Sequence, residues 1–281
     1  MRVLKQLVVV AAVAFAGQAA VGAVQGNALL TLLLGLATAG LAVLAYAWVV
    51  RWSERRAPVE VAAEGAAAAT GRGVLIGAGM FAAVIASIAL VGGYRIDGTG
   101  SVTGALGLVG FMAAAAATEE LLFRGILFRI VEERVGTRVA LVLTAVLFGL
   151  SHLFTMHASL WGAIAIAVEA GGMLAAAYAA TRTLWLPIGL HFAWNFTAAG
   201  VFGTEVSGNG AVQGLLHGVT SGPAALTGGT FGPEGSLFAV AFGLLLTLVF
   251  LRLARRRGTL VPMRRGERAG ERAGADAELA R

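Results

Sequence analysis

The chain has 281 residues, of which 58% are hydrophobic and 13% are charged, and its formal net charge at neutral pH is +6. A soluble domain cannot bury so large an apolar fraction, with a mean hydropathy of +0.83, so the composition indicates a polytopic membrane protein. Cysteine is absent, which excludes disulfides, thiolate catalysis and thiolate metal ligands.

Apolar runs of membrane-spanning length follow one another along the chain. They lie near 5–24, 28–50, 74–93, 102–131, 139–157, 159–180, 183–201 and 237–254. We therefore expect an all-α membrane bundle of about eight transmembrane helices that forms one domain. The first run follows MRVLK and contains small residues, so a cleaved signal peptide is an alternative interpretation of that run.

The segments between these runs differ in composition, and this divides the chain. The predicted parts are N-terminal spans at 1–101 with a cytoplasmic loop at 51–73, a core at 102–201, a Gly-rich extracytoplasmic loop at 202–236, a last span at 237–254 and a basic, disordered cytoplasmic tail at 255–281. The Gly-rich loop is expected to be flexible or partly re-entrant, and FGPEGS at its end is expected to be a turn.

The basic residues alternate in position with the predicted spans. If the N-terminus is cytoplasmic, nineteen of the 21 Lys and Arg residues fall on the cytoplasmic side, Arg95 falls outside, and Arg124 lies within a span. This is the positive-inside pattern. It predicts a multi-pass protein of the cell membrane with both termini in the cytoplasm. The basic charge is thus explained by topology and by attraction to anionic lipid, and we expect no nucleic-acid partner.

Six polar residues lie within the apolar runs of the second half. They are Glu119, Glu120, Arg124, His152, His191 and Asn195. We take the nearest cytoplasmic arginine as the edge of each helix and use a rise of about 1.5 Å per residue. Glu119 and His191 are then roughly 15 Å deep, and His152 and Asn195 roughly 20 Å deep, near the middle of a core about 30 Å thick. These groups are therefore expected to meet, because ionisable residues within a membrane normally face the bundle interior.

The spacing within each helix assigns different surroundings to the two glutamates. Glu120 and Arg124 are four residues apart and can form an ion pair. His191 and Asn195 have the same spacing, so their hydrogen-bonding side chains share one face of their helix. Glu119 lies about 100° around the helix from Glu120 and can face a cavity. A carboxylate beside histidines can activate water and later protonate a leaving amine, while His and Asn donors can stabilise an oxyanion. Hydrolysis by activated water is the chemistry that fits these residues best.

A metal site is an alternative. Glu119, His152 and His191 would make an acceptable zinc shell with water as the fourth ligand, although HExxH is absent. Spacing does not separate the glutamate-only mechanism from the metal-assisted one.

Three motifs in this region resemble a known family. EELLFR at 119–124, FGLSH at 148–152 and HFAWN at 191–195 are similar, in order and spacing, to the EExxxR, FxxxH and HxxxN motifs of the CAAX-protease and bacteriocin-processing family, also called CPBP or Abi. The resemblance covers about 102–200 and makes 102–201 the catalytic core. It implies an intramembrane endopeptidase with an eight-span helical core and a cavity open to the cytoplasm.

The resemblance also implies a role for each motif residue. Glu119 would activate water together with His152, His191 and Asn195 would stabilise the oxyanion, and Glu120 and Arg124 would support the site. It favours a glutamate-dependent enzyme that requires no cofactor, with zinc as the alternative. The expected partners are the lipid bilayer and a membrane-anchored protein or peptide as the substrate.

Two further residues and two other functions remain open. Glu169 is roughly as deep as Asn195 and is expected either to line the same cavity or to bond to a neighbouring helix. Phe148, one turn before His152, is a possible cavity residue but is more typical of packing. A membrane carrier with a buried polar pathway would also use buried Glu, Arg and His. A non-catalytic immunity or scaffold protein could keep the same fold.

Overall fold

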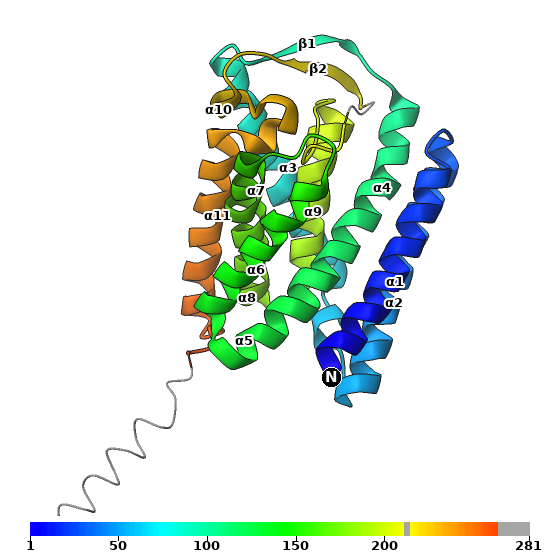
Figure 1. The fold of residues 1–281 in the computed structure, drawn as a ribbon, viewed down its shortest axis with the longest axis vertical. Helices are drawn as coiled ribbons and strands as arrows, with labels where there is room; N and C mark the ends of the chain where they lie inside the picture. The colour runs from blue at the N-terminus through cyan, green and yellow to red at the C-terminus, as the bar shows by residue number, and fades with distance from the viewer. Residues whose placement is uncertain (211–213, 264–281) are drawn as a thin grey trace, which may run out of the picture.

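The computed structural model describes residues 1–210 and 214–263. These residues form a bundle of long helices that run alongside one another, with a small sheet across one end (Figure 1). Seven helices in the described part of the chain are long and apolar enough to cross a membrane: Arg2–Ala23, Ala28–Glu54, Ala66–Leu90, Val102–Val135, Thr137–Phe154, Leu160–Thr181 and Leu237–Arg256. The chain is therefore a polytopic helical membrane protein, as the sequence predicts.

The remaining predicted span, near 183–201, is an inner helix. It consists of α9 (Trp185–Phe196) and a π-helical extension, η5 (Thr197–Val201), and it is shorter than the other spans. Most of its side chains are buried. The neighbouring helices therefore shield it from lipid, and it can carry polar side chains into the centre of the bundle.

Two of the spans are also interrupted by π-helical turns. The fourth span is α4 (Val102–Glu120), η2 (Leu121–Phe128) and α5 (Arg129–Val135), and the sixth is α7 (Leu160–Ile166), η4 (Ala167–Gly172) and α8 (Met173–Thr181). Segment η2 begins directly after Glu120, and η4 includes Glu169. Segment η5 begins two residues after Asn195. A π turn inserts an extra residue per turn and rotates the faces of the helix, and such turns are frequent at functional sites.

Glycines allow the helices that carry the polar motifs to pack closely. A side chain at Gly77 of α3 (Ala66–Leu90) would collide with the Leu190 carbonyl of α9. Gly35 of α2 (Ala28–Glu54) meets the backbone of Gly110 in α4 in the same way. Small residues at such crossings bring helix backbones together in membranes, where van der Waals packing drives association. These contacts fix α9 and α4 in the bundle.

The Gly-rich segment is more structured than expected. Strand β2 (Leu216–Thr220) pairs antiparallel with β1 (Tyr94–Thr99), and α10 (Ala224–Thr227) and the 3₁₀ turns η6 (Gly229–Phe231) and η7 (Pro233–Gly235) follow. The Tyr94 hydroxyl donates to the Phe202 carbonyl at 3.0 Å, which ties β1 to the end of the inner helix. The sheet rests on backbone pairing between segments far apart in the sequence, so composition alone did not predict it.

The loop at the opposite end of the bundle is also ordered. Helix α3 begins at Ala66, earlier than the expected loop end at 73, and the short turn η1 (Val59–Val61) tucks under the bundle. Arg129 donates to Glu54 at 2.6 Å and lies 3.5 Å from Glu60, and Glu60 also pairs with Arg56. These ion pairs hold the segment against the bundle, since carboxylates with small exposed fractions need partners.

The last span ends in an anchored segment. Helix α6 (Thr137–Ser151) begins beside the segment that follows α11 (Leu237–Arg256): the Thr137 backbone N–H donates to the Val261 carbonyl at 3.0 Å. The Thr259 hydroxyl donates to the Ala179 carbonyl at 2.7 Å. The first residues of the predicted tail, 255–263, thus continue the helix or pack on the bundle instead of being disordered. Residues 264–281 of that tail lie outside the described residues.

Candidate active site

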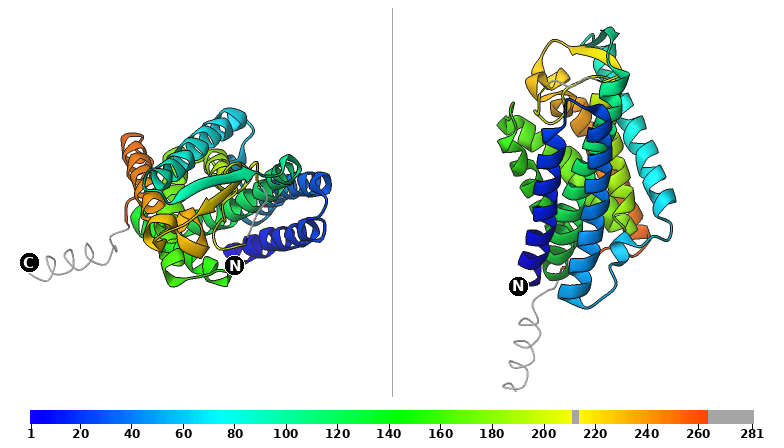
Figure 2. Two further views of the ribbon diagram at one scale, coloured as in Figure 1. Left: turned by 90° about the horizontal axis from the view of Figure 1, so that it is seen from above. Right: turned by 90° about the vertical axis from the view of Figure 1, so that its right-hand side faces the viewer.

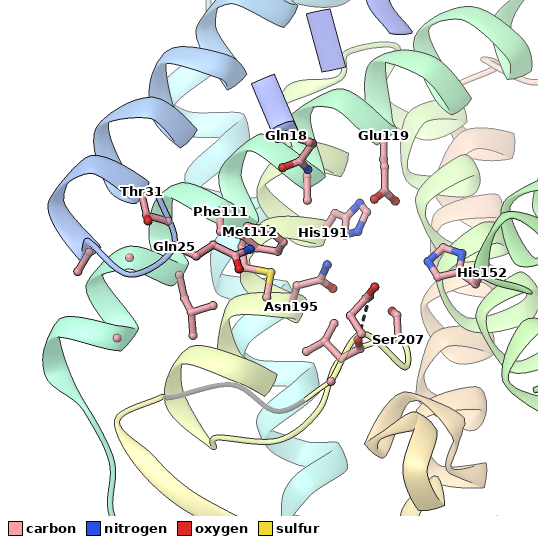
Figure 3. A pocket seen from close by; sticks show the side chains of 18 residues that line it. Gln18, Gln25, Thr31, Phe111, Met112, Glu119, His152, His191, Asn195 and Ser207 are labelled. Atoms are coloured by element: carbon pink, nitrogen blue, oxygen red, sulfur yellow. Dashed lines mark hydrogen bonds between the residues drawn. The ribbon is translucent and has the colours of Figure 1, made fainter. Parts of the chain in front are cut away.

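The motif residues meet at one cavity. Its volume is about 470 Å³, and its walls come from α1 (Arg2–Ala23), the start of α2, one face of α4, the turn after α6 that begins at His152, α9 and the segment after η5. Glu119, His152, His191 and Asn195 all line it, and Figure 3 shows them around the same hollow. The three sequence motifs therefore converge, as the depth estimates predict.

Glu119 reaches the cavity without a protein partner. It occupies the last turn of α4 and is only partly exposed. Figure 3 shows its carboxylate directed towards the space between His191 and His152. Among the residues that the structure describes, its carboxylate makes no hydrogen bond or ion pair, so both oxygens are available to water or to a substrate.

Its neighbour Glu120 has the opposite environment. The side chain is fully buried, and Oε1 accepts hydrogen bonds from Arg124 Nη1 and from His191 Nδ1, both at 2.8 Å. Arg124 Nη2 donates to the Ala170 carbonyl at 3.0 Å, and the guanidinium lies 4.5 Å from the centre of the Phe148 ring. The predicted ion pair is confirmed, and it also holds the imidazole of His191 and joins η2 to η4.

His152 is oriented by the backbone. It begins the short 3₁₀ turn η3 (His152–Phe154) at the end of α6, and its Nδ1 lies 2.8 Å from the Phe148 carbonyl oxygen. A carbonyl oxygen can only accept, so Nδ1 carries the proton and Nε2 keeps a lone pair. In His191 the Glu120 carboxylate occupies Nδ1 in the same way. Each ring is anchored through Nδ1, which leaves Nε2 as its second functional nitrogen.

Asn195 completes the α9 side of the cavity. It lies one turn beyond His191 on the same face, is 9% exposed, and lines the cavity beside Ser207 (Figure 3). The Trp194 indole at the adjacent position packs edge-on against Phe81 with ring centroids 5.1 Å apart. This packing fixes the helix at the position from which Asn195 projects.

Sequence reasoning missed Glu234. FGPEGS was expected to be only a turn, but Glu234 in η7 is 1% exposed. Its carboxylate accepts from the Ser207 N–H at 2.5 Å, the Ser207 hydroxyl at 2.7 Å and Trp194 Nε1 at 3.2 Å. Burial raises the pKa of this carboxyl, and the hydrogen bonds from Ser207 oppose that rise. Glu234 thus connects the segment that covers the cavity to the helix that carries His191 and Asn195. A single glutamate in a Gly-rich stretch of sequence does not indicate that its side chain is buried and bonded in this way.

Two residues considered for the cavity lie outside it. Glu169 is fully buried in η4 against Gly243 of α11, and neither of its carboxylate oxygens has a hydrogen-bond partner among the described residues. It is not among the residues that line the cavity. Phe148 packs against the two histidines, with ring centroids 4.9 Å from His152 and 6.1 Å from His191. Its position is that of a packing residue.

The zinc alternative requires three donor side chains to be grouped around one point. Within residues 1–210 and 214–263, no group of three or more His, Asp or Glu side chains is placed so that it could hold a metal ion. Glu119, His152 and His191 therefore do not form such a group. The bond from His191 Nδ1 to Glu120 leaves Nε2 of that ring free, so it does not bear on the question.

The cavity also has a direction within the bundle. From Glu119 and His191, its lining runs to Gln25 at the α1–α2 turn, Gly104 at the start of α4 and Asn209. The rim therefore lies at the end of the bundle that carries the sheet (Figure 1). The N-terminus lies at the other end of the bundle. The two expectations, a cytoplasmic N-terminus and a cavity open to the cytoplasm, therefore cannot both hold.

The comparison with protein families agrees with the motifs. A family model described as Type II CAAX prenyl endopeptidase Rce1-like matches residues 101–197. Residues 101–197 are an Rce1-like domain. This confirms the resemblance inferred from the motifs and implies an intramembrane protease. No curated protein and no solved structure gives a significant match to the chain.

The family domain coincides with the part of the chain that supplies the motif residues. It begins at the N-cap of α4 and ends just after Asn195. The α1–α2 hairpin, the sheet and α11 lie outside the matched range, yet α1 and α2 contribute Gln18, Gln25 and Thr31 to the cavity. The Rce1-like domain thus brings the motif residues together, and segments particular to the rest of the chain form part of the wall.

Proposed function

We propose that this multi-pass membrane protein is an endopeptidase that hydrolyses a peptide bond of a membrane-anchored protein or peptide with water activated by Glu119. The contrast between two adjacent glutamates carries this proposal. Glu120 is bonded to Arg124 and His191, whereas Glu119 faces a cavity that it shares with His152, His191 and Asn195. A carboxylate kept free at such a site is suited to proton transfer.

The mechanism needs a water between Glu119 and His152. Glu119 accepts a proton from this water with help from the lone pair of His152 Nε2, and the hydroxide oxygen bonds to the carbonyl carbon of the substrate. The carbonyl oxygen becomes an oxyanion, which the Asn195 amide stabilises by donating a hydrogen bond. As the imidazolium, His191 would donate from Nε2 to the same oxyanion while its Nδ1–H stays bonded to Glu120. When the tetrahedral intermediate collapses, the C–N bond breaks and Glu119 transfers its proton to the leaving amine.

No metal or other cofactor has a step in this mechanism. Elemental analysis of the purified protein and a chelator titration test the point. Stoichiometric zinc, with activity lost on chelation and regained when zinc is added, would replace the glutamate mechanism by a metal-assisted one.

The proposed substrate class follows from the position of the cavity. Glu119 lies well inside the membrane-spanning bundle, so the scissile bond has to reach the enzyme from a chain held at the membrane. The family name specifies prenylated CAAX proteins, and the lipid anchor of such a protein is one way to meet this need. The geometry requires a membrane anchor and does not require a particular one.

Site-directed variants test the proposal directly. Purified protein in proteoliposomes is incubated with a set of lipid-anchored peptides, and new termini are detected by mass spectrometry. Glu119→Gln is expected to lower the cleavage rate at least about a hundredfold, the usual contribution of general acid–base catalysis. The matched control, Glu64→Gln, changes an exposed carboxylate in the 62–65 loop and should retain the wild-type rate. Wild-type cleavage by Glu119→Gln would refute the mechanism.

A second variant tests the histidine. His152→Ala is expected to remove most of the activity while the protein keeps its thermal stability, because His152 bonds mainly to its own helix turn. Comparison of the membrane proteomes of cells with the wild-type protein and with Glu119→Gln would then identify substrates as uncut proteins that accumulate in the variant.

A further inference from the structure

One face of α4 gives the cavity the shape of a groove. The α4 residues in its lining recur every three or four positions: Gly104, Gly107, Leu108, Phe111, Met112, Ala115 and Glu119. Such residues share one face of a helix. The fifteen residue steps from Gly104 to Glu119 span roughly 22 Å at the rise of an α-helix. An extended peptide advances about 3.3 Å per residue, so roughly six residues would fit between the rim and Glu119.

The opposite wall of the groove offers hydrogen bonds in an apolar setting. Gln18 and Gln25 of the first hairpin and Thr31 of α2 face the cavity, and Figure 3 shows Gln18 near Glu119 and Gln25 farther along. The Gln18 side-chain oxygen is buried and has no hydrogen-bond partner among the described residues. A buried amide without a partner is unfavourable, particularly within a membrane span. The backbone N–H and C=O groups of an extended chain are the partners that such amides suit.

The floor of the cavity closes the groove towards the arginine-rich end. Beyond Glu119 and His191 lie the buried Glu120–Arg124 pair and the Tyr46 hydroxyl, which donates to the Gly125 carbonyl at 3.1 Å. The rim is at the other end, where Gln25 and Asn209 are exposed. A chain therefore enters the groove from the end that carries the sheet.

The distribution of charge assigns a membrane side to that end. Of the sixteen Lys and Arg residues within 1–210 and 214–263, fourteen belong to the segments at the opposite end of the bundle, and Arg95 in β1 is the one at the rim end. The positive-inside pattern places the arginine-rich end in the cytoplasm. The rim of the groove then faces the non-cytoplasmic side.

We infer that the groove binds an extended segment of a membrane-anchored protein, about six residues long, that enters from the non-cytoplasmic side and bonds through its backbone to Gln18 and Gln25. This inference rests on the proposed endopeptidase function. It identifies the substrate as a chain anchored in, or emerging at, the outer leaflet. It excludes cytoplasmic tails, so the substrate side is opposite to the one expected from the family resemblance.

The absence of cysteine makes the side of the rim directly measurable. Single cysteines are introduced as Gly26→Cys at the α1–α2 turn and Ala63→Cys in the loop at the arginine-rich end. Both sites are exposed, and a side chain at Gly26 meets no other atom within 4 Å. In intact cells, a membrane-impermeant maleimide is expected to label Gly26→Cys at once and Ala63→Cys only after the membrane is permeabilised. The reverse labelling would overturn the inference whether or not the protein cleaves peptides.

Occlusion of the rim tests the path of the substrate. In proteoliposomes that cleave a lipid-anchored peptide, a bulky maleimide on Asn209→Cys is expected to lower the cleavage rate at least about tenfold. The same reagent on Ala63→Cys in permeabilised proteoliposomes should leave the rate unchanged. Equal rates for labelled and unlabelled Asn209→Cys would refute entry at the rim. Failure of the unlabelled proteins to cleave at all would instead count against the proposed function.

The glutamine wall has its own test. Gln18→Leu is expected to raise KM about tenfold with little change in kcat, as expected for the loss of hydrogen bonds made in both ground and transition states. The matched control, Ala16→Leu, adds apolar volume at an exposed position of the same helix and should keep the wild-type KM. An unchanged KM in Gln18→Leu would remove Gln18 from the binding site.

Discussion

The two ends of the bundle treat buried charge in opposite ways. At the arginine-rich end, each carboxylate with a small exposed fraction has an arginine partner: Glu54 with Arg129 and Arg56, Glu60 with Arg56, and Glu132 with Arg182. Around the cavity, Glu119, Asn195 and Gln18 line the hollow without an arginine partner among the described residues. Paired charges specify geometry and are costly to break, whereas unpaired polar groups are left to meet a substrate. One end therefore maintains the fold, and the other is organised for function.

The boundary between these two regions runs between consecutive residues. Glu120 belongs to the structural network, since it contacts Arg124 and His191, and Glu119 belongs to the cavity. If this division is correct, substitutions on the two sides of the boundary should separate into losses of stability and losses of turnover.

The largest effect on stability is expected from Arg124→Met. The substitution leaves the fully buried Glu120 without its ion pair and removes the hydrogen bond to the Ala170 carbonyl. Breaking a buried pair on one side typically costs about 3–5 kcal/mol. Denaturant titration of the purified protein in detergent measures the loss. Glu119→Gln is the matched control, because it changes the adjacent carboxylate and should unfold as the wild type does. Equal destabilisation by both variants would show that the two glutamates belong to a single network.

Arg129→Met tests the arginine-rich end. Arg129 binds Glu54, Gln6 and the Gly125 carbonyl, and its side chain is 8% exposed. Its removal is expected to lower the free energy of unfolding by about 3 kcal/mol while turnover per folded molecule stays unchanged. The exposed Arg134, changed to Met, provides the control and should have little effect on either quantity. A loss of kcat in folded Arg129→Met would show that the two ends are coupled.

Glu120→Gln tests the boundary itself. A glutamine can accept from Arg124 or from His191 Nδ1, but without the negative charge it holds the imidazole less well. We expect kcat to fall about tenfold with KM unchanged, in the range of one charge-assisted hydrogen bond. In a His191→Ala background the same substitution should lower kcat little further, because the residue on which Glu120 acts is gone. Additive effects in this double-mutant cycle would mean that Glu120 does not act through His191.

Most of the helical framework was predictable from the sequence. Apolar runs and the alternation of arginines locate the spans, because lipid requires long hydrophobic helices with internally satisfied backbones. The π turns, the β1–β2 pairing and the anchored 257–263 segment were not predictable. A π turn adds one residue without a compositional mark, and the β1–β2 pair joins residues more than a hundred positions apart. Such features depend on tertiary contacts that periodicity does not contain.

The candidate site was predictable where the sequence carries charge in an apolar run. Glu119, His152, His191 and Asn195 were placed together by counting residues along straight helices, and the structure does bring them to one cavity. The same counting placed Glu169 at this depth, but depth does not specify which way a side chain faces, and Glu169 is not part of the cavity lining. The Gln18 and Gln25 wall was missed, because an uncharged amide in a span adds little to a search for ionisable groups.

Glu234, also missed, provides the prediction with the smallest expected effect. Burial raises the pKa of its carboxyl, although hydrogen bonds from Ser207 oppose this. A raised pKa in the folded state means that the native protein binds more protons than the unfolded chain above the ordinary value of 4.5. The stability that this group contributes is therefore complete below about that pH and is lost as the pH rises through the folded pKa. Glu234→Gln cannot titrate, so its unfolding free energy should fall less steeply than that of the wild type as the pH rises above about 4.5. Chemical unfolding of wild type, Glu234→Gln and the exposed control Glu64→Gln measures these slopes.

Parallel pH profiles of the unfolding free energy for Glu234→Gln and the wild type would show that the Glu234 carboxyl does not have a raised pKa. The segment over the cavity would then be held by neutral hydrogen bonds from Ser207 and Trp194 alone.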